Sequence, residues 1–176
     1  MDLKKLITTI PDFPVKGIQY KDVTSILTQP KAFQHTVTKI TSYCIKNKIT
    51  DIVAPDARGF LWGAPVALDL GIPLHIVRKP GKLPPPTYEH HFTYEYAETN
   101  LNIKQDAKLG PDSNVCIIDD VSATGGTASA IYELLGEFRV ENVKYACVID
   151  LTFLEGTAKL QGYCGIDTFS VVEYDA

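Results

Sequence analysis

Two adjacent aspartates, Asp119 and Asp120, follow four apolar residues in the stretch VCIIDDVSATGGT at 115–127. Neighbouring carboxylates repel each other, and the Gly125–Gly126 pair adds backbone entropy that folding must overcome. Backbone N–H groups at the start of the helix that follows suit a phosphate, and the upstream carboxylates suit sugar hydroxyls or a hydrated cation. The combination of strand, aspartates, glycine loop and helix therefore predicts a sugar-phosphate site. An ordinary strand-to-helix connection with solvated aspartates is the alternative.

Two other common phosphate-binding loops do not occur in the sequence. A Walker A loop requires GxxxxGK[ST], and no Gly-Lys pair of this chain is followed by Ser or Thr. A dinucleotide-binding fold requires GxGxxG, which is also missing.

Cations that could hold an anionic ligand follow two predicted strands. Arg58 follows the predicted strand at 51–54 and directly precedes the predicted helix at 59–71, where it could bind a diphosphate. Arg78, Lys79 and Lys82 cluster in RKPGK after the second. A solvated basic turn would explain RKPGK alone, but together with Arg58, in a chain of net charge −4, an anion site is favoured.

The elements that must position these residues alternate along the chain. Apolar runs predict strands at 51–54, 73–77, 115–119, 145–150 and 167–174. Helical spacing predicts helices near 3–7, from Pro30 through Phe33, Val37, Ile40, Cys44 and Ile45, at 59–71 with Gly71 as its end, and at 127–138. This alternation predicts an α/β fold with a mainly parallel sheet covered on both faces. The stretch 78–103, rich in Pro, Tyr and charge, interrupts the pattern and predicts a loop or hairpin.

Bulk composition limits the class of protein. The 176 residues, 45% of them hydrophobic, suit one domain spanning 1–176. The acidic balance argues against a general nucleic-acid binder, and no apolar run approaches the ~20 residues of a membrane helix. The N-terminus lacks the pattern of a secretory signal, so a cytoplasmic protein is expected. Four separated cysteines, without a CxxC pair, are expected to be buried reduced thiols rather than disulfides or zinc ligands.

The stretch VCIIDDVSATGGT resembles the 5-phosphoribosyl-1-pyrophosphate (PRPP) signature of type I phosphoribosyltransferases. Hypoxanthine-guanine enzymes of that superfamily carry an aspartate where this loop has Ala123, and the Ala-Thr-Gly-Gly-Thr form is typical of adenine phosphoribosyltransferases. Other segments are similar in order and spacing, and together they cover nearly the whole chain. They are IPDFPVKGIQYKDVTSIL (10–27), DARGFLWGAPVA (56–67), VRKPGKLP (77–84), YEYAETNLNIKQDA (94–107) and DLTFLEG (150–156).

The resemblance implies a mainly parallel twisted sheet with a small hood and a flexible loop over the active site. It implies the reaction of adenine with PRPP to give AMP and pyrophosphate in purine salvage, with Mg²⁺ bridging diphosphate oxygens. Asp119 and Asp120 would bind the ribose hydroxyls and reach the metal mainly through water or substrate. The 5′-phosphate would lie against Ala123, Thr124, Gly125, Gly126 and Thr127. The diphosphate would be held by Arg58, Gly59, Arg78, Lys79 and Lys82.

For the base, the resemblance implies an N-terminal binding segment at about 1–28. Tyr20 occupies the family's stacking position, which is usually Phe, and Leu151 the opposite wall, while the backbone of Gln19 and Lys21 would read the base edges. A half-buried surface tyrosine is the plain alternative for Tyr20.

A mobile hood is implied at about 82–103, carrying Glu95 at the place of a glutamate that exchanges a proton with the purine. Glu95 and Arg58 are thus the expected catalytic residues. Glu95 could equally be the outward residue of a hairpin strand, with Glu89 and Glu98 as substitutes. The adjacent His90 and His91 lack a third ligand at metal-binding spacing.

Two other functions stay open at this point. One is transfer to another base, namely hypoxanthine, guanine, xanthine or orotate. Ala123 and Glu95 argue against the hypoxanthine-guanine branch. The other is a non-catalytic PRPP-sensing regulator, although no DNA-binding module or basic face is visible in the sequence. The family resemblance also implies a homodimer, with no nucleic-acid or membrane partner.

Overall fold

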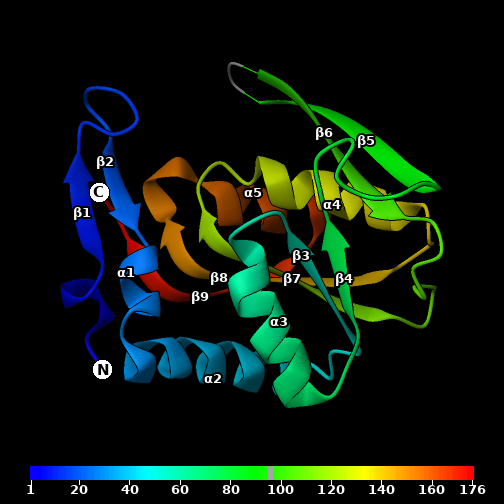
Figure 1. Cartoon of the computed structure of the whole chain (residues 1–176), viewed down its shortest axis with the longest axis horizontal. Helices are drawn as coiled ribbons and strands as arrows, with labels where there is room; N and C mark the ends of the chain where they lie inside the picture. The colour runs from blue at the N-terminus through cyan, green and yellow to red at the C-terminus, as the bar shows by residue number, and fades with distance from the viewer. Residues whose placement is uncertain (95–96) are drawn as a thin grey trace.

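Five parallel strands form the central sheet of the described chain, in the order β4 (Leu74–Val77), β3 (Asp51–Pro55), β7 (Asn114–Ser122), β8 (Asn142–Leu151), β9 (Asp167–Tyr174) (Figure 1). A computed structural model describes residues 1–94 and 97–176, and the side chains of all these except 92–94 and 97–99. Each strand but β9 is followed by a helix or a longer excursion, as parallel pairing requires. The predicted α/β fold with a mainly parallel sheet is therefore confirmed.

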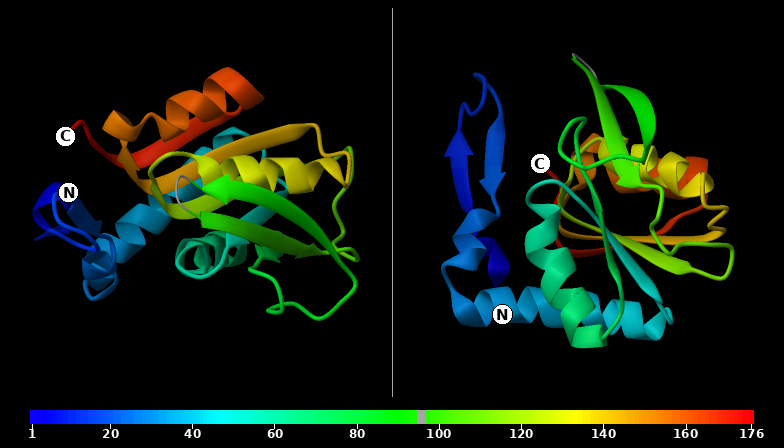
Figure 2. Two further views of the ribbon diagram at one scale, coloured as in Figure 1. Left: turned by 90° about the horizontal axis from the view of Figure 1, so that it is seen from above. Right: turned by 45° about the vertical axis from the view of Figure 1, so that its right-hand side comes forward.

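Helices cover both faces of this sheet. Helices α2 (Pro30–Lys46) and α3 (Gly59–Leu70) lie on one face, and α4 (Gly126–Gly136) and α5 (Gly156–Cys164) on the other (Figure 2). Pro30 occupies the first turn of α2, and Gly71 ends α3, both as predicted.

The apolar run of strand β7 is unbroken because both faces of this strand are buried. Cys116 and Ile118 join the core under α2 and α3, whereas Val115 and Ile117 join the core under α4 and α5. Successive side chains of a strand point to opposite faces, so a strand buried on both sides needs apolar residues at every position. The two carboxylates at the far end of β7 therefore stand out as positions that core packing alone does not explain.

Two hairpins lie outside the central sheet. One pairs β1 (Thr8–Pro11) with β2 (Gln19–Asp22), and the other pairs β5 (Thr87–Tyr94) with β6 (Ala97–Lys104). The second hairpin packs over α4, partly through an edge contact of Tyr88 with Phe138 at 5.3 Å between ring centroids. Both chain termini lie at the side of the molecule where β1 and β2 stand (Figure 1). The excursion predicted at 78–103 is thus mostly the β5–β6 hairpin.

Three sequence predictions need correction. The helix expected near 3–7 is only a 3₁₀ turn, η1 (Leu3–Lys5), because the following Thr-Thr-Ile-Pro stretch is extended in β1. Ile45 was expected on the buried face of α2, yet it is 63% exposed, since it follows buried Cys44 by only one position. Strand β7 runs to Ser122 instead of ending at 119, because β8 supplies ladder partners that far.

The remaining elements are α1 (Thr24–Leu27) and η2 (Thr152–Leu154). Within the described residues, none of the helices combines the length and apolarity needed to cross a membrane. Three of the four cysteines, Cys44, Cys116 and Cys147, are buried, and all four are free thiols.

Candidate active site

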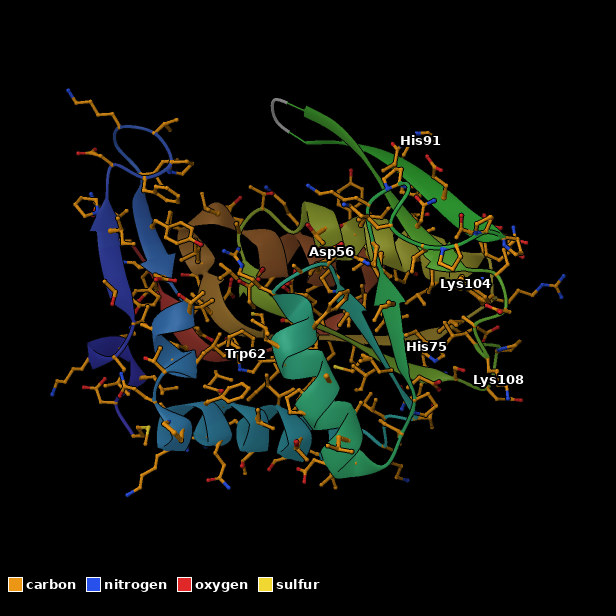
Figure 3. The ribbon with its side chains drawn as sticks, viewed as in Figure 1. Asp56, Trp62, His75, His91, Lys104 and Lys108 are labelled. Carbon is orange, nitrogen blue, oxygen red and sulfur yellow. The ribbon has the colours of Figure 1, made fainter. Side chains whose placement is uncertain are left out.

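A cavity of about 770 Å³ opens at the carboxyl ends of β3, β7 and β8 and is closed on one side by the β1–β2 hairpin. In α/β sheets this end is where ligands bind. Asp56 marks this end of β3 in Figure 3, whereas His75 on β4, which pairs with Asp51, lies toward the opposite end. The lining residues are Gly17, Ile18, Gln19, Tyr20, Lys21, Pro55, Asp56, Ala57, Arg58, Asp119, Asp120, Val121, Ala123, Thr127, Leu151, Phe153, Leu154 and Ala176.

One cation links three elements of the cavity wall. Arg58, at the start of α3, forms an ion pair with Asp120 of β7, with 2.5 Å between Nε and Oδ2. The same guanidinium donates a hydrogen bond to the Tyr20 hydroxyl on β2. The Asp120 side chain is almost fully buried, while 44% of the Arg58 side chain is exposed. A cation with one side toward solvent and the cavity can hold a diphosphate while Asp120 fixes its place.

The two aspartates have different surroundings. Asp119 precedes Asp120 on β7, so their side chains leave opposite faces of the strand, and the Asp120 N–H donates to Asp119 Oδ1 at 2.8 Å. Burial raises the pKa of the Asp119 carboxyl well above its usual range, and the Asp120 carboxylate adds to the rise. The cation beside Asp120 thus reduces the expected repulsion, and the raised pKa of Asp119 reflects the part that remains.

The glycine loop takes a shape that few residues allow. Gly125 has φ +82° and stands at the N-cap of α4, so the loop turns directly into that helix. A Cβ at Gly125 would lie 2.8 Å from the Gly156 carbonyl oxygen. A small cavity of about 40 Å³ adjoins the loop, lined by Asp119, Val121, Ser122, Ala123, Gly125, Thr127, Ala128 and Tyr145. The N-terminal N–H groups of α4 therefore face a region that could hold an anion.

Gly156, at the start of α5, packs directly against the backbone of the glycine loop. A Cβ at Gly156 would lie only 2.4 Å from the Ala123 carbonyl oxygen. The segment between Leu151 and Gly156 therefore connects the apolar wall of the large cavity to the glycine loop. Thr157 donates to Asp150 Oδ2 at 2.7 Å and fastens the start of α5 to the end of β8.

The basic residues predicted after β4, Arg78, Lys79 and Lys82, are not among those that line the cavity. Arg78 pairs with Asp56 at 2.8 Å and also donates to the Lys82 carbonyl at 3.2 Å. Arg78 thereby ties the turn after β4 to the loop that carries Arg58. Lys79 and Lys82 are exposed and are not among the residues that line the cavity. Gly59, Thr124 and Gly126 likewise lie beside the lining rather than in it.

The base-binding candidates line the cavity together. Tyr20 meets the edge of Phe13, with ring centroids 5.1 Å apart. The Lys21 ammonium lies 4.6 Å from the centre of the Tyr174 ring on β9 and donates to the Thr9 hydroxyl at 3.2 Å, so its charge is engaged by residues outside the cavity lining. Gln19 and Leu151 complete this set.

The hood glutamate lies outside the described residues. Glu95 follows β5 in the sequence, and nothing is described of its structure. Glu89 of β5 accepts hydrogen bonds from Asn100, at 2.6 Å, and from Asn102, at 3.3 Å. The Glu89 carboxylate is thus engaged within the hairpin.

Several lining residues were not singled out from the sequence. Phe153, 49% exposed, and Leu154 follow β8 in the DLTFLEG stretch, and Gly17 and Ile18 precede Tyr20. The sequence signal that could have identified Phe153 is an aromatic residue shortly after a predicted strand, at the end of the sheet where ligands bind.

Oxygen donors suited to a hard cation are present, since Asp119 and Asp120 both line the cavity. Among the described side chains, no cluster of three His, Cys, Asp or Glu residues is gathered. This donor set fits Mg²⁺ that keeps water and substrate oxygens as most of its ligands.

Comparison with known proteins agrees with this geometry. A family model for the phosphoribosyl transferase domain matches residues 22–163. An adenine phosphoribosyltransferase of Methanococcus maripaludis is 46% identical over 175 residues, which cover 99% of each chain. The solved adenine phosphoribosyltransferase of Thermoanaerobacter pseudethanolicus is 40% identical with a TM-score of 0.91, covering 98% of each chain.

A third similar protein was solved with a base analogue. The enzyme of Giardia lamblia, complexed with 9-deazaadenine, is 35% identical with a TM-score of 0.91, covering 99% of this chain and 97% of its own. The type I phosphoribosyltransferase fold expected from the sequence motifs is confirmed by these structures. The chain therefore belongs to the phosphoribosyltransferase family and, within it, to the adenine phosphoribosyltransferases.

Proposed function

We propose that this chain transfers the 5-phosphoribosyl group of PRPP to adenine, giving AMP and pyrophosphate for purine salvage. A purine nitrogen attacks the anomeric carbon, the bond from that carbon to the diphosphate oxygen breaks, and the purine loses a proton. The observation that carries the proposal is one cavity that joins an apolar base wall, a carboxylate-held arginine and a glycine loop at a helix N-terminus.

Adenine would stack between the Tyr20 ring and Leu151, with backbone groups of Gln19 and Lys21 at its edges. Exposed apolar side chains nearby support a flat heterocycle here, since Ile18 is 44% and Phe153 49% exposed at the cavity wall. The Giardia relative, solved with 9-deazaadenine, supports the same ligand class.

The ribose 5-phosphate would lie across the end of β7. Its 5′-phosphate would bind the loop from Ala123 to Thr127, at the positive end of α4. Its hydroxyls would donate to Asp119 and Asp120. Because Asp120 already pairs with Arg58, a ribose bound there would lie next to the cation that meets the diphosphate.

Charge builds on the leaving diphosphate as the anomeric carbon becomes oxocarbenium-like, so cations near it lower the barrier. Arg58 is the nearest of the proposed diphosphate ligands to the reacting centre, with Gly59 beside it. Arg78 would act mainly by fixing the loop that carries Arg58, as its contact with Asp56 suggests. Lys79 and Lys82 would approach from the exposed turn.

Mg²⁺ is proposed as the cofactor, and when bound it would neutralise diphosphate charge. Asp119 and Asp120 would hold it, mainly through water and substrate oxygens. Glu95 is proposed to exchange a proton with the purine. Exclusion of water around a carboxyl raises its pKa toward neutrality, as acid–base work requires.

We further propose that residues 1–176 act as one catalytic domain and that two copies form a homodimer. Helix α3 exposes Leu61 by 40% and Leu68 by 83%, an apolar surface that a second copy could cover. The buried free thiols suit the reducing cytoplasm, where PRPP and nucleobases are found.

One assay tests the reaction. Purified protein is incubated with Mg²⁺, PRPP and, separately, adenine, hypoxanthine, guanine, xanthine or orotate, and nucleotide and pyrophosphate are measured. AMP and pyrophosphate in equal amounts are expected with adenine. Product with another base but not adenine would contradict the specificity, and no product with any base would favour the PRPP-sensing regulator. Omission of Mg²⁺, with a chelator present, should abolish product.

A further inference from the structure

Tyr20 contributes both an aromatic ring and a hydrogen-bonded hydroxyl group to the site. Its hydroxyl accepts a hydrogen bond from Arg58 Nη1, and the same guanidinium uses Nε to pair with Asp120. A phenylalanine at this position would supply an equal stacking face and no such bond. The base wall and the diphosphate cation are therefore joined by one hydroxyl group.

The three groups approach from separate elements. Tyr20 belongs to the β1–β2 hairpin, Arg58 precedes α3, and Asp120 lies on β7 of the central sheet. Asp120 is nearly inaccessible and its strand is paired on both sides, so it is the fixed end of this chain of contacts. The β1–β2 hairpin pairs with no strand of the central sheet, so Tyr20 is the end that can adjust.

The Tyr20 ring also has a restricted orientation. Phe13 meets it edge-on, with an angle of 75° between the ring planes. Since Tyr20 lines the cavity as well, a flat base stacked on it would fix the ring from the cavity side. A fixed ring holds its hydroxyl in place, and the hydroxyl in turn holds the Arg58 guanidinium.

We propose that the Tyr20 hydroxyl couples occupancy of the base region to occupancy of the diphosphate region, by positioning Arg58. This inference rests on the proposed function, because it takes adenine and a diphosphate as the two ligands.

The coupling is expected to be positive. An arginine side chain loses rotamer freedom when its guanidinium is held, and Asp120 restrains Arg58 only through Nε, so part of that freedom remains to be lost. If a stacked base has already ordered Arg58 through Tyr20, a diphosphate binds without that loss. By reciprocity, a bound diphosphate raises adenine affinity by the same factor. Tyr20 is here a positioning residue, acting on the diphosphate through Arg58.

Calorimetric titration with non-reacting ligands measures this factor directly. Adenine is titrated into the protein with and without saturating pyrophosphate, always with Mg²⁺, for wild type, Tyr20→Phe and Tyr163→Phe. Tyr163 lies on α5 and is 95% exposed, so its variant controls for loss of a tyrosine hydroxyl.

In wild type, pyrophosphate should raise adenine affinity roughly fivefold or more, within the usual range of coupling between sites. In Tyr20→Phe, pyrophosphate should raise adenine affinity by less than about twofold. In Tyr163→Phe, the increase should equal that of wild type. Adenine affinity without pyrophosphate should change little in Tyr20→Phe, because the ring remains.

A double-mutant cycle identifies the partner. Arg58→Lys keeps the charge but cannot reach Tyr20 and Asp120 in the same geometry, so it should also remove the coupling. Adding Tyr20→Phe to Arg58→Lys should then change the factor no further. An independent additional loss would contradict the proposed contact.

The outcomes separate the two proposals. If wild type binds both ligands without coupling, or if Tyr20→Phe keeps the full factor, the inference is overturned and the proposed reaction stands. If wild type binds neither adenine nor pyrophosphate, the proposed function fails, and the inference fails with it.

Discussion

Arg58 and Asp120 are held together at 2.5 Å although they stand on different elements, and only Asp120 is deeply buried. Arg58→Ala should therefore leave a buried carboxylate without a cation, at a cost of about 2 kcal/mol in the free energy of unfolding. It should also lower kcat/KM for PRPP roughly 100-fold or more, since a cation at the leaving group is lost. Urea unfolding and steady-state kinetics measure the two effects.

The double variant Arg58→Ala/Asp120→Asn tests the stability effect, while its activity should be low for two reasons, because Asp120 is also a proposed ribose ligand. Removing the orphaned charge should restore most of the lost stability while activity stays low. Recovery of activity together with stability would show that Arg58 has only a structural part.

Asp119 should make the protein less stable as the pH rises. Its pKa is raised by burial, so the folded chain keeps this proton to a higher pH than the unfolded chain does, where the pKa is about 3.9. The folded state then binds more protons, and its stability falls from about pH 4 upward through the raised pKa. Asp119→Asn should therefore raise the melting temperature at pH 7, because the cost of ionising a buried carboxyl is removed.

The difference between wild type and Asp119→Asn should vanish below about pH 4, where both chains are neutral at this position. Calorimetric melts from pH 4 to 8 give the profile. A variant less stable than wild type at pH 7 would refute the argument, and PRPP binding should weaken regardless, because a proposed ribose ligand is changed.

Gly156→Ala should damage the glycine loop selectively, since its Cβ would meet the Ala123 carbonyl at 2.4 Å. KM for PRPP should rise at least about tenfold, which corresponds to a loss of about 1.4 kcal/mol or more in the free energy of phosphate binding. KM for adenine should rise much less. Gly162→Ala is the matched control on α5, because nothing lies within 4 Å of its Cβ. Gly162→Ala should leave both KM values unchanged, and its free energy of unfolding should stay the same or rise by up to about 1 kcal/mol. Equal changes in both KM values would argue against a role confined to the loop.

Glu95→Gln should lower kcat more than PRPP affinity, because it removes proton exchange and keeps the shape of the side chain. A loss of about 100-fold is typical of a removed acid–base group. Glu89→Gln on the same hairpin is the control, since Glu89 is engaged with Asn100 and Asn102. Near-normal turnover of Glu95→Gln would remove it from the catalytic role, and Glu98 would be tested next.

Leu68→Glu should convert a homodimer into a monomer, because a charge would be placed on the exposed apolar face of α3. Light scattering after size-exclusion chromatography should give twice the monomer mass for wild type and the monomer mass for the variant. Ile45→Glu, at another exposed apolar position on α2, should leave the mass unchanged. A monomeric wild type would reject the dimer.

The sheet and most helices could be predicted because their apolar patterns are strong. Strand β7 and helix α4 are marked by VCII and by Ile131, Leu134 and Leu135, all buried as the pattern required. Helix α5 was missed because Leu160 is its one large buried side chain, which leaves no periodic apolar stripe. The β1–β2 hairpin was missed because TTIP and QYKD are largely polar and exposed.

Within the site, residue types could be predicted but contacts could not. Asp120 and Arg58 were candidates from their positions after strands, yet nothing in the sequence pairs them across 62 positions or joins Tyr20 to both. The need for glycine at 156 depends on how α5 approaches the loop, which is a property of packing alone.

Within the described residues, the β1–β2 hairpin shares no strand pairing with the central sheet. The β5–β6 hairpin is joined to that sheet by one backbone bridge, between Asn102 of β6 and Arg78 just after β4. These weak attachments bear on how ligands enter. A two-stranded hairpin is marginally stable alone and depends on what it packs against. Amide hydrogen exchange in β1–β2 and β5–β6 should therefore occur by local opening, while the amides of β3, β7 and β8 exchange only on global unfolding. The cavity wall formed by the β1–β2 hairpin can then open for adenine or AMP while the five-stranded core remains folded.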